Sequence, residues 1–230
     1  MKHFCTAVFV VGSFFLFGIQ QAALAQVQEV SYSDISKMER TTLGLLRSIP
    51  YRMTRTAETF PERGKEASWK GVLIVETNPP DRSRQISVTT TQGKSERWEI
   101  VSISGRHYQR FNDGPWQVLP PPPPPKDTEP KNAPASVGSR PKIEAQAQLV
   151  ETLTEKGRLV SVYDTKSTTT REVDGKEVVQ IVTSKYWFRD DGMLLKKVSE
   201  IETLRDPKIV KNTTVYEYED IKVEAPTVNQ

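Results

Sequence analysis

The chain has 230 residues and a formal net charge of +3, with 32 lysine and arginine residues against 29 aspartate and glutamate residues. The two signs are interspersed, and no basic stripe of the kind that nucleic-acid-binding domains carry is present, which argues against a nucleic-acid partner. The only cysteine is Cys5, so the chain beyond the N-terminal segment forms no disulfide bond and offers no thiolate to a metal or a substrate.

The N-terminal segment predicts a secretory signal peptide. Lys2 and His3 precede an apolar run over residues 7–19, and Ala23-Leu24-Ala25 provides a small-x-small cleavage site. The run is shorter than the roughly 20 residues that a transmembrane helix needs. We therefore expect residues 1–25 to be removed after Ala25, leaving residues 26–230 as a periplasmic or secreted chain without a transmembrane span.

Residues 31–49 predict an amphipathic helix. Apolar side chains recur there at three- and four-residue spacing, among them Ile35, Met38, Leu45 and Leu46. Ser33 is the expected N-cap, and Pro50 is expected to end the helix.

From Trp69 onward, the apolar period changes to two, and turn residues follow at intervals of about ten residues. This pattern predicts an antiparallel meander of about ten strands in a single, mainly β domain. The stretch 143–153 fits a helix or a strand, and we favour the strand. The expected strands are 69–77, 84–91, 94–103, 106–111, 116–119, 143–153, 158–166, 177–188, 193–204 and 210–218. The expected turns include Gln92-Gly93, Ser104-Gly105, Asp174-Gly175 and Asp206-Pro207.

A proline-rich segment interrupts the strands. Residues 120–125 are six consecutive prolines, and residues 120–141 hold nine of the 16 prolines in the chain. Consecutive prolines adopt a stiff polyproline II rod. The segment could be a ligand for a proline-recognition module or a surface connector. We favour the connector, because such modules mostly act inside cells.

No catalytic or metal-binding constellation is visible in the sequence. Apart from His3, His107 is the only histidine, and no nucleophile, phosphate-binding or dinucleotide-binding motif is present. The acidic pairs Asp190-Asp191 and Glu219-Asp220 are neighbours in sequence, and such neighbours do not face each other as an acid/base pair must. We therefore expect no catalytic residue, no metal and no cofactor.

Several expected strands are apolar on both faces, as in residues 71–75 and 178–182. An antiparallel sheet that is covered on one face alternates more cleanly. The apolar surplus therefore predicts that the second face lines a groove for a hydrophobic ligand. The expected wall positions are Trp69, Leu73, Ile86, Val88, Trp98, Ile100, Ile181 and Trp187, and the expected lid positions are Ile35, Met38, Leu45 and Leu46.

The order of short motifs along the chain resembles the periplasmic lipoprotein-carrier superfamily, which includes LolA, LolB, the LppX/LprG proteins and RseB. The motifs are Pro50-Tyr51-Arg52, Asn78-Pro79-Pro80-Asp81-Arg82, Gly105-Arg106-His107-Tyr108, Gly114-Pro115-Trp116, the segment from Trp187 to Leu195, Tyr216-Glu217-Tyr218 and Val223-Glu224-Ala225-Pro226. The resemblance covers nearly all of residues 26–230. The chain departs from the family in its proline-rich segment and in its scarcity of lid helices.

The resemblance implies a strongly curved, unclosed half-barrel with an N-terminal helix as plug or lid. It also implies a non-catalytic carrier whose partner is a lipid or the acyl chain of a lipoprotein. The chain has no lipid-modified cysteine after the signal, which favours a soluble carrier like LolA. An RseB-like envelope sensor or protein-interaction module remains the alternative, with an envelope protein as its partner. An envelope hydrolase is the third interpretation.

Overall fold

The computed structural model describes residues 28–120, 141–173, 175–219 and 221–228. The predicted signal peptide, most of the proline-rich segment, and Asp174 and Asp220 lie outside these ranges. In the described residues the fold is one helix and twelve strands, which confirms the prediction of a mainly β chain. The strands are β1 (Gln28–Val30), β2 (Tyr51–Phe60), β3 (Trp69–Asn78), β4 (Arg82–Thr91), β5 (Lys94–Ile103), β6 (Arg106–Phe111), β7 (Gln117–Leu119), β8 (Lys142–Glu155), β9 (Arg158–Val173), β10 (Lys176–Arg189), β11 (Leu194–Thr203) and β12 (Asp206–Glu217).

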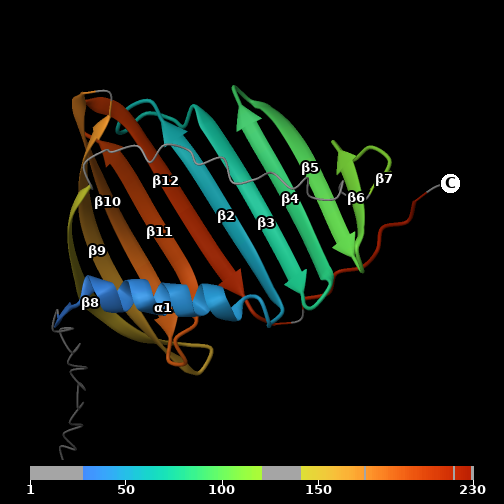
Figure 1. Ribbon diagram of the computed structural model, residues 1–230, viewed down its shortest axis with the longest axis horizontal. Coiled ribbons are helices and arrows are strands. Elements are labelled where there is room, and N and C mark those ends of the chain that lie inside the picture. The colour runs from blue at the N-terminus through green and yellow to red at the C-terminus, as the bar shows by residue number, and fades with distance from the viewer. Residues whose placement is uncertain (1–27, 121–140, 174, 220, 229–230) are drawn as a thin grey trace, which may run out of the picture.

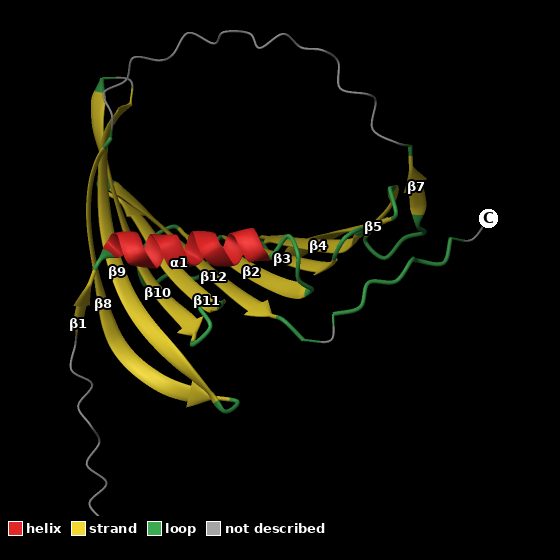
Figure 2. Cartoon of the chain, turned by 60° about the horizontal axis from the view of Figure 1, so that its bottom comes forward, coloured by secondary structure: helices red, strands yellow, loops and turns green. Residues whose placement is uncertain are grey.

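All strands belong to one antiparallel sheet, in the order β1-β8-β9-β10-β11-β12-β2-β3-β4-β5-β6-β7 (Figure 1). Two meanders, β2 to β7 and β8 to β12, are joined where β12 pairs with β2, with Ile209 opposite Phe60. The terminal strands β1 and β7 are not paired with each other, so the sheet curves without closing (Figure 2). This is the unclosed half-barrel that the resemblance implied.

Tight turns set the register of the hairpins. Gln92 and Gly93 have φ values of 50° and 77°, and Lys156 and Gly157 have values of 49° and 77°. Two consecutive residues with positive φ form the turn that matches strand twist, and a glycine at the second position makes it accessible. One expected turn was wrong in position. Thr203 pairs with Asp206, so the chain reverses at residues 204–205 and not at Asp206-Pro207.

The helix α1 (Tyr32–Leu45) is shorter than the predicted 31–49. Its N-cap is Ser31, whose hydroxyl accepts a hydrogen bond from the amide of Ser33 at 3.2 Å, so the expected cap at Ser33 was wrong by two residues. The helix ends early because the next amides bond to carbonyls three residues back, as Ser48 N does to Leu45 O at 2.9 Å. No helix in the described ranges is long and apolar enough to cross a bilayer.

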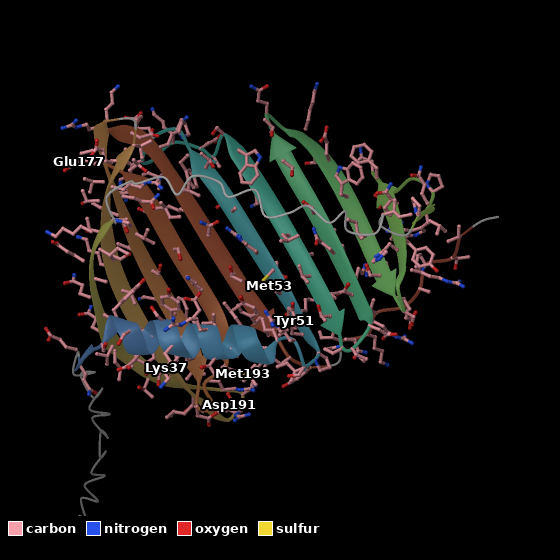
Figure 3. All side chains as sticks on the ribbon, viewed as in Figure 1. Lys37, Tyr51, Met53, Glu177, Asp191 and Met193 are labelled. Atoms are coloured by element: carbon pink, nitrogen blue, oxygen red, sulfur yellow. The ribbon has the colours of Figure 1, made fainter. Side chains whose placement is uncertain are left out.

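The helix lies on the concave side of the sheet, across strands β8 to β12 (Figure 2). Its buried stripe forms the main core with side chains of these strands. The buried members of this core are Ile35, Leu46, Ala147, Tyr186, Phe188, Leu194 and Tyr216. Tyr51 and Met53 of β2 border the core where α1 ends (Figure 3).

Candidate functional site

Cross-strand register identifies the residues that share the concave face. Directly opposed residues project to the same side of a sheet. One row of opposed residues crosses eight strands, and it consists of Tyr186, Lys197, Thr214, Arg55, Leu73, Ser87, Trp98 and Phe111. Because Tyr186 packs against α1, the whole row lies on the concave face.

The part of this face under α1, on strands β8 to β12, is the covered half. Thr42 joins the helix to the β10–β11 hairpin: its hydroxyl donates to Gly192 O and accepts from Leu194 N, both at 3.1 Å. Glu39 Oε1 lies 2.7 Å from Lys197 Nζ, and Tyr186 donates its hydroxyl to the other oxygen of Glu39 at 3.4 Å. These polar contacts fix the helix over its apolar core.

Burial and ion pairing change the pKa of Lys197 in opposite directions. Burial alone would lower the pKa of Lys197, but the hydrogen bond to Glu39 and the nearby hydroxyl of Tyr186 outweigh burial, and the pKa is raised. Burial also raises the pKa of Tyr186. At neutral pH, the lysine is therefore charged and the tyrosine neutral, so both contacts to Glu39 are formed.

The part of the concave face on strands β3 to β6 is not covered by α1 and is called the open half (Figure 1). It carries a group of apolar side chains, the open patch, made of Trp69, Leu73, Trp98, Ile100 and Phe111. Trp98 and Phe111 are 47% and 43% exposed, with their ring centroids 5.0 Å apart. Ile100 is half-buried on the same strand as Trp98, and Leu73 is half-buried two strands from Trp98, with Ser87 between them.

The Trp69 ring lies against the backbone of its own strand, because the residue beneath the ring is Gly71. A Cβ atom placed on Gly71 would come within 2.5 Å of the Trp69 ring. Any side chain at position 71 would therefore displace the indole. The concave side chains of β4, such as Ser87, are polar and lie between Leu73 of β3 and Trp98 of β5. The open half is therefore a mixed surface, and its aromatic side chains are the part that suits contact with hydrocarbon.

The register divides the eight expected wall positions between the two faces. Trp69, Leu73, Trp98 and Ile100 lie on the concave face. Ile86 and Val88 are opposed to Ile74 and Val72 and lie on the outer face. The outer face also carries Ile181 and Trp187, the latter with Lys196 Nζ 4.9 Å from its ring. The expectation that all eight share one face was therefore wrong. Their role in ligand binding stays a prediction.

Sequence reasoning missed Phe111, which enters the open patch through its pairing with Trp98. Of the expected lid positions, Ile35 and Leu46 are buried and Met38 packs against the core, whereas Leu45 is 43% exposed. Leu45 thus points away from the helix–sheet contact.

The outer face of the open half carries charges and the C-terminal segment. Glu99, only 1% exposed, accepts hydrogen bonds from Arg84, Arg97 and Arg110. Burial alone would raise the pKa of Glu99, but the hydrogen bonds from Arg110 and Arg84 and their charges lower it below the ordinary value. Residues 221–228 run along this side (Figure 2), with Val223 buried.

A pocket of about 740 Å³ differs in character from the open patch. Most of its lining side chains are polar and belong to the outer face of β8 to β11, such as Asp164 and Lys185, whose charged atoms are 3.4 Å apart. A polar lining of this kind does not favour hydrocarbon.

One contact bears on the hydrolase interpretation. Ser102 Oγ lies 2.8 Å from His107 Nδ1, and both side chains project from the concave face. A catalytic serine also needs a group that orients the imidazole and donors for the oxyanion. Within the described ranges, no carboxylate bonds to His107, and no group of three metal-binding side chains exists. The pair alone does not make a hydrolase site. The two predicted acidic neighbours Asp190 and Asp191 are each paired with an arginine.

No protein-family model and no curated protein matches the sequence. Among solved structures, the chain is similar to an outer membrane lipoprotein-sorting protein domain from Vibrio parahaemolyticus, with 9% identity over 80% of this chain and 91% of the other, at a TM-score of 0.27. It is similar to a LolA superfamily protein from Nitrosomonas europaea, with 9% identity over 84% and 94% of the chains, at a TM-score of 0.26. It is also similar to a DUF1329 family protein from Desulfovibrio piger, with 10% identity over 81% of this chain and 92% of the other, at a TM-score of 0.24. One of these descriptions names the LolA superfamily, and another names lipoprotein sorting. TM-scores this low support no inference about function.

Proposed function

We propose that this chain binds a lipid, or the acyl chain of a lipoprotein, on the open half of the concave face and carries it through the periplasm without chemical change. The observation behind this proposal is the open patch. Trp98 and Phe111 are nearly half exposed there and contact each other, on the same face as Leu73, Ile100 and Trp69. Apolar side chains that gather on one exposed face mark a binding site more often than scattered ones do.

The driving force for this binding would be transfer of hydrocarbon out of water. Each buried methylene contributes about 0.8 kcal/mol, so an acyl chain that covers the open patch gains several kcal/mol in total. The covered half supports the same interpretation, because α1 buries the equivalent aromatic side chains there and leaves the open half as the accessible apolar surface.

The test is a fluorescence titration with a neutral probe, a pyrene-labelled diacylglycerol. We expect Leu73→Glu, Trp98→Glu and Ile100→Glu together to lower the affinity by on the order of a hundredfold or more, since charges replace the apolar surface. The matched control is Ile86→Glu, Val88→Glu and Ile181→Glu on the outer face, which should retain binding. Circular dichroism shows whether both variants stay folded. Equal affinity of the folded concave variant and the wild type would contradict the proposal.

Mass spectrometry of the protein from its native envelope fraction would identify the natural ligand. A bound mass that solvent extraction releases as lipid is the expected result. If the protein instead released an acid and an alcohol from an ester substrate, and Ser102→Ala abolished this release, the result would support a hydrolase.

A further inference from the structure

We propose that the concave site selects amphiphiles with a negatively charged head group, which Arg55 binds while the hydrocarbon lies on the open patch. This inference rests on the proposed function and narrows its ligand class.

Arg55 occupies the middle of the concave face, at the border between the covered and open halves. In the concave row it is opposed to Thr214 on β12 and to Leu73 on β3. Its side chain is exposed, and Nη2 lies 3.3 Å from the side-chain oxygen of Asn212. A guanidinium has five N–H donors arranged in a fork that fits a carboxylate or phosphate. A single long bond to a neutral amide leaves most of these donors available.

The arginines that surround Glu76 and Glu99 on the outer face differ from Arg55 in their pairing. Arg52, on the same strand, lies 2.7 Å from Glu76, and Arg84 and Arg110 both pair with the buried Glu99. In the described part of the chain, none of the ion pairs involves Arg55, whereas Arg52, Arg84, Arg97 and Arg110 each pair with a glutamate. The concave side of β2 therefore presents a positive charge that the protein itself does not neutralise.

The other charges near this position do not supply the missing partner. Lys197 lies two strands away in the concave row, which at about 4.8 Å per strand is roughly 10 Å. Its charge is balanced by Glu39 of α1. The row as a whole thus carries one uncompensated positive charge, at Arg55.

The distance from Arg55 to the aromatic part of the open patch suits a ligand with separate polar and apolar parts. Leu73 is on the next strand, and Trp98 is three strands away, roughly 14 Å at the usual spacing. An anionic group at Arg55 places the start of a hydrocarbon chain over Leu73 and its continuation over Trp98 and Phe111. Charge-assisted hydrogen bonds are about twice as strong as neutral ones, so the head group adds selectivity to the hydrophobic contact.

The experiment compares dodecyl phosphate with dodecanol, which has the same hydrocarbon chain, through their effect on tryptophan fluorescence of the full chain after signal removal. We expect the wild type to bind dodecyl phosphate about tenfold more tightly or better. Arg55→Gln should remove this preference and leave dodecanol affinity unchanged, and Arg55→Lys should keep part of it. The matched control is Arg106→Gln, an exposed arginine on the outer face that should keep the full preference.

Three results would overturn part of the interpretation. Equal wild-type affinity for the two amphiphiles, or an unchanged preference in Arg55→Gln, overturns the head-group inference alone. Inorganic phosphate binding as tightly as dodecyl phosphate overturns the amphiphile as ligand, because it would show a free-anion site. If neither amphiphile binds, the proposed function itself fails.

Discussion

The two halves of the concave face use the same kind of side chain for opposite purposes. Under α1, Phe188 is fully buried and stacks on Tyr186, with ring centroids 5.9 Å apart. On the open half, Trp98 and Phe111 also contact each other, with ring planes tilted by 54°, but each remains nearly half exposed. The helix covers the first pair and leaves the second uncovered. An aromatic ring on this sheet therefore contributes to stability or is available for binding according to its position relative to α1.

This comparison predicts that truncation under the helix is the most costly change. Phe188→Ala should lower the free energy of unfolding by about 3–5 kcal/mol, because it leaves a cavity in the closed core. Urea denaturation followed by circular dichroism measures the loss. A loss below 1 kcal/mol would show that α1 does not cover this residue in solution.

The next effect comes from the contacts that hold the helix in place. Thr42→Val keeps the shape of the side chain but removes the hydroxyl that bridges α1 and the β10–β11 hairpin. It leaves the buried amide of Leu194 unpaired, so we expect a loss of about 2 kcal/mol in the same measurement. Thr41→Val is the control. Its hydroxyl bonds only within the helix, to Lys37 O, and its loss should be within about 0.5 kcal/mol.

The ion pair between α1 and the sheet should give a smaller, pH-dependent effect. Glu39→Gln removes the partner of Lys197 and should cost about 0.5–1 kcal/mol at neutral pH. Because the pKa of Lys197 is raised in the folded state, its contribution is complete below the unfolded pKa and is lost as pH rises through the folded pKa. The difference between wild type and variant should thus shrink at strongly alkaline pH. A difference that stays constant there would contradict this role.

The smallest effect on stability is expected on the open half. Trp98→Ala removes a side chain that is already half exposed, so the unfolding free energy should change by less than about 1 kcal/mol. The affinity for the pyrene-labelled diacylglycerol should nevertheless fall about tenfold. A large loss of stability with unchanged affinity would reverse the roles assigned to the two halves.

The sequence predicted the strands well where glycine turns and a period of two coincide. Strand β5 has the predicted bounds, because Gln92-Gly93 and Ser104-Gly105 end it on both sides. Strand β2 was missed. Its sequence, from Tyr51 to Phe60, has few aliphatic residues and alternates threonine with charged side chains, so its strand conformation depends on pairing with β3 and β12.

The site could be predicted only in part. Strand β3 is apolar at Val72, Leu73, Ile74 and Val75, so its sequence does not tell which residues face the concave side. The helix identifies the concave face, because it buries Tyr186. The pairing of the strands then shows that Leu73 lies on the same face as Tyr186. For the same reason, Ile86 and Trp98 could not be separated by pattern alone.

The main core joins the first element of the chain to the last strands. The apolar stripe of α1, with Ile35 and Leu46, lies near the start of the chain, whereas its partners Phe188, Leu194 and Tyr216 lie near the end. Contacts between residues so distant in sequence form slowly, because a long loop must close first. A chain that is synthesised from its N-terminus therefore has the helix unpartnered until the last strands follow. During that interval the stripe is exposed to solvent and to other chains, so the slowest step of maturation is expected to be the docking of the first element onto the last.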